Sequence, residues 1–415
     1  MEESTPLITN DAVVLGLLFL ILGFIFKTSS SSNAFWRKFY TYVPAVLMCY
    51  FVPSIFNSLG VISGDHSQLY FVTSRYMLPA CLVLLTLSTD FKEIAKLGSK
   101  AIIMFLTGTV GILIGGPLSI LFFSYVAPSV IGAESEEVWR GMTTIAGSWI
   151  GGGANQAAMK EVFQVNDALF SKMVTVDVIV ANIWMAFLLI GAGKSKLMDE
   201  IFKADSSAID EVKDKIEKYR ASISKIPTLP DVMLILAVGF GITGLAHLMS
   251  DWIAPFLQTN YPELEKYSLT SGFFWLIVIS TTFGLILSFT KLRELEGVGA
   301  SRVGSVIIYL LVATIGMKMN VVAIFESPGL FLIGIVWMLV HITLLLIVAK
   351  IIRAPFFFVA VGSQANVGGA ASAPIVASAF HPSLAPVGVL LAVLGYALGT
   401  YAAYICGILM QMVSQ

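Results

Sequence analysis

Apolar residues follow one another along this chain in runs of about 17 to 27 residues. A helix of roughly 17 to 25 predominantly apolar residues is long enough to cross the hydrocarbon core of a bilayer. Ten such runs are present, at 11–27, 40–60, 68–89, 101–127, 170–193, 231–250, 271–289, 303–320, 328–350 and 386–411. The pattern predicts an all-α polytopic membrane protein with ten transmembrane helices.

Two further apolar segments, 138–163 and 356–380, are interrupted by glycines at their centres. Both breaks have the same form: Gly-Ser, three or four residues, Gly-Gly-Ala, two residues and Ala, beginning at Gly147 and Gly362. Glycine permits a chain reversal and leaves the backbone open to a ligand. Irregular backbone at membrane depth is tolerated where it lines a cavity, and broken helices of this kind form solute sites in secondary transporters. We therefore expect both segments to be re-entrant hairpins.

The order of these elements repeats along the chain. Residues 1–193 and 229–415 each contain four spans, a hairpin and one more span. A hairpin that enters and leaves on one face leaves five crossings in each half. Because five is odd, the second half inserts upside down relative to the first. The sequence thus predicts a five-plus-five inverted repeat.

Basic residues indicate the orientation, because Lys and Arg collect in cytoplasmic loops. The net charge is only −1, but the 194–228 link is rich in basic residues, namely Lys194, Lys196, Lys203, Lys213, Lys215, Lys218, Arg220 and Lys225. We place this link inside, either as an amphipathic helix on the membrane surface or as a solvated tether. Both termini and the acidic loops around Asp65 and Glu263 are then outside. A mean hydropathy of +0.86 excludes an ordinary soluble protein.

The side chains beside the two glycine breaks are neutral and polar. A hairpin tip exposes carbonyl groups at the end of the incoming half-helix and N–H groups at the start of the outgoing one. We expect a solute to bind there, to Ser148, Gly152, Gly153, Asn155 and Gln156 in the first hairpin and to Ser363, Gln364, Asn366, Gly368, Gly369 and Ser372 in the second. The alternative is that the small residues only allow helices to pack closely.

Asp177 is the most informative ionisable residue, since it lies within the span that follows the first hairpin. A carboxylate inside a membrane is costly unless it is paired, protonated or metal-bound. We expect Asp177 to couple transport to sodium or protons, together with Thr175 and Asn182 and, for sodium, with the tip carbonyls. The alternative is a carboxylate solvated near the outer end of its helix. His341 is interpreted as a hydrogen-bonded interior histidine, and Lys160 and Glu161 as interfacial anchors.

The two glycine motifs and the segment Leu87-Ser88-Thr89-Asp90-Phe91 resemble the family catalogued as domain of unknown function 819. This family of bacterial and plastid membrane proteins is similar to sodium/glutamate and sodium/citrate symporters and, more distantly, to bile-acid symporters and cation/proton antiporters. The resemblance implies a homodimer in the bacterial inner membrane, whose core moves against a dimeric scaffold in an elevator fashion. Relatives that carry multivalent carboxylates can use an arginine near a hairpin. Neither tip has one here, which argues against a di- or tricarboxylate.

Two functions fit these features. The first is a cation-coupled symporter of a small organic solute, such as an amino acid, a short peptide or a monocarboxylate. The alternative is a sodium/proton antiporter in which Asp177 exchanges the two ions. An enzyme is not expected, because HExxH, Gly-x-Ser-x-Gly and paired intramembrane aspartates are absent from the sequence. The expected partners are the solute, the lipid bilayer and a second copy, with Na⁺ as the possible coupling ion, no organic cofactor and no nucleic acid.

Overall fold

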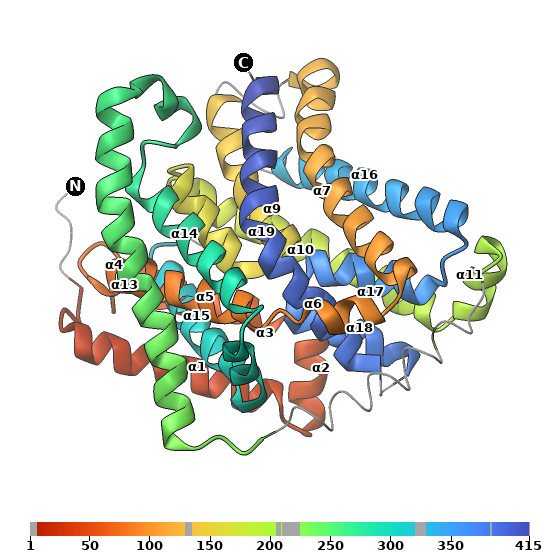
Figure 1. The fold of residues 1–415 in the computed structure, drawn as a ribbon, viewed down its shortest axis with the longest axis horizontal. Helices are drawn as coiled ribbons and strands as arrows, with labels where there is room; N and C mark the ends of the chain where they lie inside the picture. The colour runs from red at the N-terminus through yellow and green to blue at the C-terminus, as the bar shows by residue number, and fades with distance from the viewer. Residues whose placement is uncertain are drawn as a thin grey trace.

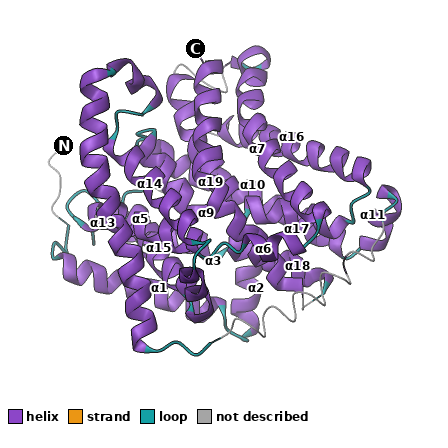
Figure 2. Cartoon of the chain, in the orientation of Figure 1, coloured by secondary structure: helices purple, strands orange, loops and turns teal. Residues whose placement is uncertain are grey.

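The computed structural model describes residues 6–128, 135–204, 209, 225–319, 329–381 and 384–414, and this part of the chain is helical without strands (Figure 2). The first half contains α1 (Asp11–Ser29), α2 (Ala34–Tyr42), α3 (Ala45–Ser58), α4 (Leu69–Val72), the π-helix η1 (Thr73–Met77), α5 (Leu78–Leu87), α6 (Phe91–Lys96), α7 (Ser99–Val126), α9 (Ser135–Val162), α10 (Asp167–Ala192) and α11 (Ser195–Phe202). The second contains α13 (Leu229–Asn260), η2 (Pro262–Tyr267), α14 (Gly272–Leu287), η3 (Lys291–Val298), α15 (Ala300–Gly316), α16 (Gly329–Ile352), α17 (Phe356–Val367), α18 (Gly369–Phe380) and α19 (Ala385–Ser414).

Among the described residues, seven helices are long and apolar enough to cross a membrane, and two bent helix pairs raise this number to as many as nine. The predicted span 40–60 is one of the bent pairs, because α2 and α3 meet at an angle of 90°. Pro44 lies at this bend and disfavours helical geometry at the residue before it. The other pair is α14 with η3, and α15, at 17 residues, is shorter than the seven long helices.

One predicted span is much shorter than the helix that contains it. The span expected to end at 250 continues as α13 to Asn260. The apolar run stops at Asp251, but a charged residue at a membrane surface does not interrupt helical hydrogen bonds. Hydropathy therefore marks the apolar part of a helix, whereas the helix itself extends further.

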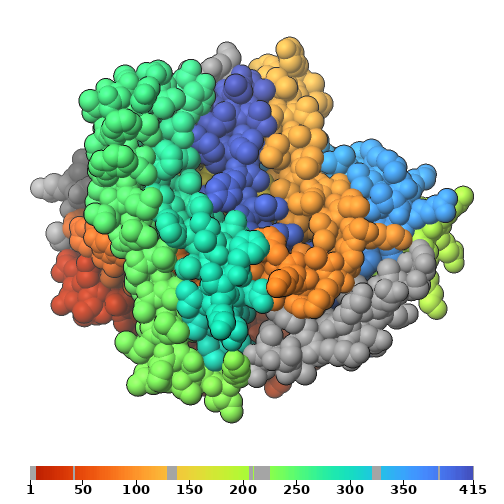
Figure 3. Space-filling view, in the orientation of Figure 1, coloured from red at the N-terminus to blue at the C-terminus, as the bar shows by residue number. Residues whose placement is uncertain are grey.

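The helices form two groups that pack mainly among themselves (Figure 1). One group, called the scaffold group, comprises α1, α3, α4, η1, α5, α13, α14 and α15, and the other, called the core group, comprises α7, α9, α10 and α16 to α19. In Figure 3 the scaffold helix α13 and the core helices α7 and α16 lie on opposite sides of the face shown, with α19 visible between them. Each half of the chain therefore supplies scaffold helices first and core helices afterwards.

The chain reverses at both glycine breaks. Within α9, Gly152 has φ 72° and ψ −173°, a conformation that is essentially restricted to glycine. Arg140 Nη1 donates to the carbonyl oxygen of Phe163 over 3.1 Å. In a straight helix these residues would be about 35 Å apart, at about 1.5 Å per residue. Likewise Gly369 has φ +56°, and the rings of Phe357 and Phe380 are 5.3 Å apart. Both segments are helical hairpins whose two ends meet.

Part of the predicted 194–228 link lies outside the described residues, namely 205–208 and 210–224. The described part begins with α11, in which Asp199 Oδ1 accepts a hydrogen bond of 2.7 Å from the backbone N–H of Phe356 at the start of α17. This contact fastens the link to the second hairpin. The amphipathic helix, the cytoplasmic location of the link and the outward location of the termini remain predictions.

Candidate functional site

The two hairpin tips lie side by side at the centre of the core group. A Cβ atom built on Gly369 would lie 4.0 Å from the Cα atom of Gly152. A Cβ atom on Gly399 of α19 would lie 2.6 Å from the Cα atom of Gly151. The contact at Gly399 leaves no room for a Cβ atom, and the position of Gly369 favours glycine because its φ is +56°. These close contacts bring the irregular backbone of both hairpins to one place.

A cavity of about 490 Å³ adjoins the tips, within the size range of small-molecule sites. It is lined by ten of the residues that the sequence predicts for the site, namely Ser148, Gly152, Gly153, Gln156, Asp177, Asn182, Gln364, Gly368, Gly369 and Ser372. The facing wall comes from the scaffold group and includes Tyr50 of α3 together with Ser305 and Tyr309 of α15. The cavity thus lies between the two groups of helices.

Asp177 lines this cavity and is buried, with 5% of its surface exposed. The indole Nε1 of Trp149 donates to its Oδ1 over 2.6 Å, and the amide Nε2 of Gln156 donates to its Oδ2 over 2.8 Å. The Ser148 hydroxyl lines the same cavity close to this carboxylate. Within the described part of the chain, Asp177 makes no ion pair. The alternative of a solvated carboxylate at a helix end does not fit this burial.

Tyr50 connects this carboxylate to the scaffold group. Its hydroxyl donates to Gln156 Oε1 over 3.1 Å, and the other end of the same amide reaches Asp177. No feature of the sequence singles out Tyr50, because a tyrosine in an apolar span is as well explained by packing. Trp149 was missed for the same reason.

The second hairpin presents an incompletely satisfied amide beside the cavity. Gln364 Nε2 donates to Ser372 Oγ over 2.7 Å, while Gln364 Oε1 is buried and has no hydrogen-bond partner among the described residues. A buried polar atom without a partner costs about 1–3 kcal/mol. A Cβ atom at Gly368 would come within 2.2 Å of the Gln364 amide, so a larger residue there would displace this side chain. The amide of Gln364 is therefore able to gain a bond from a bound molecule.

Four predicted site residues do not line the cavity: Asn155, Ser363, Asn366 and Thr175. The two asparagines instead bind carbonyl oxygens of the hairpins, at Gly151 beside the first tip and at Gly362 within α17. Asn155 Nδ2 donates to the carbonyl oxygen of Gly151, and Asn155 Oδ1 accepts from the hydroxyl of Thr400 in α19. Asn366 Nδ2 donates to the carbonyl oxygen of Gly362. The hydrogen bonds of these two side chains connect the hairpin tips to the surrounding helices. Thr175 donates to a carbonyl oxygen of its own helix.

Replacing Asn366 with Leu is expected to destabilise the protein by at least about 2 kcal/mol. Asn366 Nδ2 donates to the carbonyl oxygens of Gly362 and Phe105, and its Oδ1 accepts from Thr109. Leucine keeps the volume but removes all three buried hydrogen bonds, each of which contributes about 0.5–1.5 kcal/mol. Thermal unfolding in detergent measures the effect. Thr109→Val removes one of the three bonds and should give a smaller loss, so an equal loss in both variants would contradict this assignment.

Ser363 takes part in a linear series of hydrogen bonds that includes His341. Trp184 Nε1 donates to Ser363 Oγ over 2.8 Å, and Ser363 Oγ lies 2.8 Å from His341 Nε2. His341 Nδ1 lies 3.0 Å from the carbonyl oxygen of Gly108. Because a carbonyl only accepts, Nδ1 carries the proton and Nε2 accepts from Ser363. The prediction of a hydrogen-bonded interior histidine is confirmed.

A cluster of three or more His, Cys, Asp or Glu side chains that could hold a metal ion does not occur among the described residues. Cys49, Cys81 and Cys406 are free and buried. Oxygen ligands for a hard cation are nevertheless close together, since the Asp177 carboxylate and the Ser148 hydroxyl both lie at the first hairpin tip.

Comparison with known proteins agrees with this membrane architecture. The family described as Protein of unknown function (DUF819) matches residues 16–413. The chain is also similar to the Uncharacterized membrane protein YjcL of Bacillus subtilis (strain 168), with 25% identity over 369 residues that cover 85% of this chain and 86% of that protein. The family match extends over both glycine breaks, both groups of helices and the cavity between them. The chain therefore belongs to the DUF819 family of membrane proteins.

Proposed function

We propose that this protein is a secondary active transporter, a cation-coupled symporter that carries a small organic solute by an elevator movement of the core group against the scaffold group. The cavity carries this proposal. It lies between the two groups, and its lining includes a buried carboxylate beside two broken helices. A solute held there is bound mainly by core residues, so a sliding core would take the solute with it.

The proposal includes a five-plus-five inverted repeat with two re-entrant hairpins. The same order of elements in both halves supports it, as do the meeting ends of each hairpin. A hairpin whose ends meet has to enter and leave a membrane on one side. The distribution of Lys and Arg then places the mouth of the first hairpin outside and that of the second inside.

Asp177 is proposed to bind the coupling ion. A buried carboxylate without an ion pair is costly inside a membrane. We therefore expect the core to move only when a cation or a proton neutralises this charge. Ser148 and the carbonyl groups that end the incoming half-helix would supply further oxygen ligands for Na⁺. Among the described residues, Asp177 is the only ionisable acid that lines the cavity. This observation also supports the second candidate, a sodium/proton antiporter in which the two ions compete for Asp177.

The lining of the cavity restricts the class of solute. Within the described part of the chain it contains no Lys, Arg or His side chain. A solute with two or three carboxylates would be desolvated without a counter-charge, which costs several kcal/mol per ion. The half-helices that begin near Gly153 and Gly369 each offer about half a positive charge. An amino acid, a short peptide or a monocarboxylate fits these charges better than a polycarboxylate.

Thermal unfolding of the purified full-length protein tests the function. Amino acids, dipeptides and monocarboxylates are added with NaCl or KCl, and a solute bound at about 100 times its Kd stabilises the folded state by about 2.7 kcal/mol. We expect stabilisation by one solute class that is stronger in sodium or at low pH. Uptake of the same labelled solute into vesicles then follows the cation gradient. Stabilisation by sodium with no solute effect, together with sodium-driven pH changes, would instead support the antiporter.

A further inference from the structure

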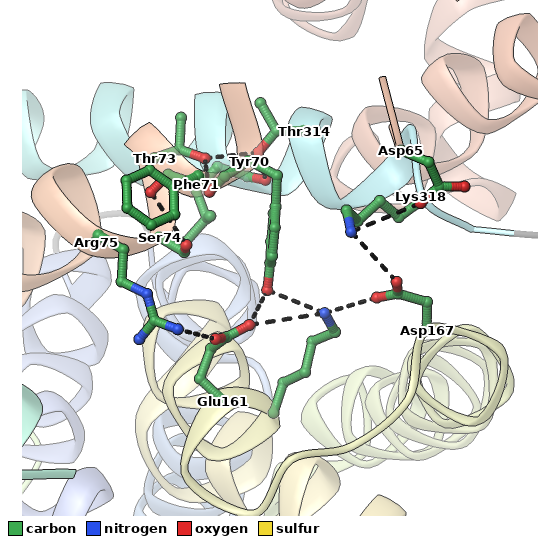
Figure 4. Close-up of polar contacts among 12 residues, drawn as sticks. Asp65, Tyr70, Phe71, Thr73, Ser74, Arg75, Glu161, Asp167, Thr314 and Lys318 are labelled. Carbon is green, nitrogen blue, oxygen red and sulfur yellow. Dashed lines mark hydrogen bonds and ion pairs between the residues drawn. The ribbon is translucent and has the colours of Figure 1, made fainter. Parts of the chain in front are cut away.

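A cluster of charged side chains joins the core group to the scaffold group at one end of the cavity-lining helices (Figure 4). The core group contributes Lys160 and Glu161 from the end of the first hairpin and Asp167 from the first turn of α10. The scaffold group contributes Tyr70 of α4, Arg75 of η1 and Lys318, which follows α15, and Asp65 precedes α4. We call these seven residues the ion cluster. Lys160 is predicted from the sequence to be an interfacial anchor, but its exposed fraction is only 4%.

Lys160 forms the buried centre of the ion cluster. Its Nζ lies 2.7 Å from Asp167 Oδ1 and 2.9 Å from the hydroxyl of Tyr70, to which it donates. Glu161 Oε1 lies 3.8 Å away. Lys160 and both acids belong to the core group, so these ion pairs persist when the core moves as one body. A buried charge that keeps its partners avoids the penalty of about 3–5 kcal/mol that follows the loss of one.

Other contacts of the ion cluster cross from the core group to the scaffold group. Arg75 Nη2 lies 3.2 Å from Glu161 Oε2, and Tyr70 donates to Glu161 Oε1. Lys318 Nζ lies 3.6 Å from Asp167 Oδ2 and 3.8 Å from Asp65 Oδ1. Figure 4 shows the scaffold side chains reaching toward Glu161 and Asp167. Arg75 and Lys318 are partly exposed, with 33% and 22% of their side-chain surface accessible, so these pairs can be exchanged for water.

The cavity extends along α10 and α15 in the direction away from the ion cluster. Along α10, Asp167 comes ten residues before Asp177, about 15 Å at 1.5 Å per residue, whereas Met185 lines the cavity on the other side. Along α15 the cavity is lined from Ser305 to Val312, and Lys318 lies beyond. Ile375, 52% exposed, lines the cavity away from the cluster.

We propose that the ion cluster is a latch that closes the outer end of the solute path. The scaffold-to-core pairs of Arg75 and Lys318 hold the core in the conformation seen here, in which the cavity extends toward the side predicted to be cytoplasmic. These pairs must break before the core can slide and open the cavity to the outside. This inference rests on the proposed transport function. Beyond that function, it specifies which conformation of the transporter the structure represents and which contacts stabilise this conformation.

The test measures access to the cavity from each side of the membrane. Asn182 lines the cavity, and the native cysteines are fully buried, so Asn182→Cys gives one reactive position. A membrane-impermeant maleimide is added to sealed right-side-out or inverted vesicles that contain the full chain. The double change Arg75→Gln and Lys318→Gln is expected to raise the labelling rate from outside about tenfold, the ratio that a change of about 1.4 kcal/mol in the conformational equilibrium produces. Lys96→Gln is the control, because Lys96 pairs with Glu93 inside α6.

The outcomes separate the latch from the transport function. An unchanged rate from outside, with normal labelling from inside, would overturn the latch and leave the transporter standing. Labelling from neither side would overturn both. If the double variant does not fold, Lys318→Gln alone removes the more weakly held pair and should raise outside labelling about threefold. A rate equal to that of the Lys96→Gln control would then contradict the proposal.

Discussion

Replacing Asp177 with Asn is expected to lower cation-driven solute accumulation by at least about 100-fold while the protein remains folded. The change removes the only charged side chain that lines the cavity among the described residues. An amide is uncharged and does not hold the coupling cation. The charge of the site therefore no longer distinguishes an empty carrier from a cation-loaded one. A loss of 100-fold corresponds to about 2.7 kcal/mol. Labelled solute uptake, measured with and without a sodium or proton gradient, gives the result directly.

Stability distinguishes this outcome from misfolding. Trp149 and Gln156 both donate to Asp177, and an asparagine oxygen can accept from one of them. The donor that is left without an acceptor costs about 1–3 kcal/mol. This cost is offset because the variant no longer buries a charge. We therefore expect a midpoint of thermal unfolding within a few degrees of the wild type. Asp251→Asn, at an exposed acid of α13, is the matched control and should keep full coupling. Gradient-driven uptake that survives Asp177→Asn would refute the role of Asp177.

Replacing Gly152 with Ala is expected to destabilise the protein strongly and to abolish transport. Gly152 has φ 72° and ψ −173°, a region that side chains rarely enter and that costs about 1–3 kcal/mol or more in backbone strain. The new Cβ atom would also lie 3.3 Å from the Tyr396 ring, so the ring would have to shift. The tip would relax to relieve the strain and displace Ser148 and Gln156 from the Asp177 carboxylate. Thermal unfolding and solute uptake measure the two effects.

The adjacent glycine is the control for this change. Within the part of the chain that the structure describes, no atom lies within 4 Å of the position that a Cβ of Gly153 would occupy, and its φ is not positive. Gly153→Ala should therefore leave the thermal midpoint nearly unchanged, or raise it slightly by restricting the unfolded chain. Equal destabilisation by both substitutions would mean that the reversal at Gly152 does not require glycine.

The amino-acid sequence determines the elements and the location of the site to a large extent. Long apolar runs and a pair of matching glycine breaks can be recognised locally, because a membrane penalises polar and irregular backbone wherever it occurs. An acid in such a run is equally conspicuous, and the prediction that Asp177 lies close to the first tip agrees with its bonds to Trp149 and Gln156. The predicted hairpin segments match α9 and the pair α17 and α18 within a few residues.

The direction of each side chain was decided only by the tertiary structure. Asn155 and Gln156 are neighbours in sequence, but successive residues of a helix point about 100° apart. One amide therefore caps a carbonyl against α19, while the other reaches Asp177. Because the sequence does not specify side-chain directions, Ser363 is predicted as a site residue, although its hydroxyl bonds to His341.

By itself, the sequence determined a helical membrane protein with two broken segments and one costly carboxylate, since each is a property of a short stretch of chain in lipid. Only the tertiary structure decided how helices from both halves divide into a scaffold group and a core group. It also decided that Tyr50 faces the cavity and that Arg75 and Lys318 reach the acids of the first hairpin and α10. These contacts join residues roughly 90 to 150 positions apart. No local pattern encodes them, because they depend on how whole helices pack.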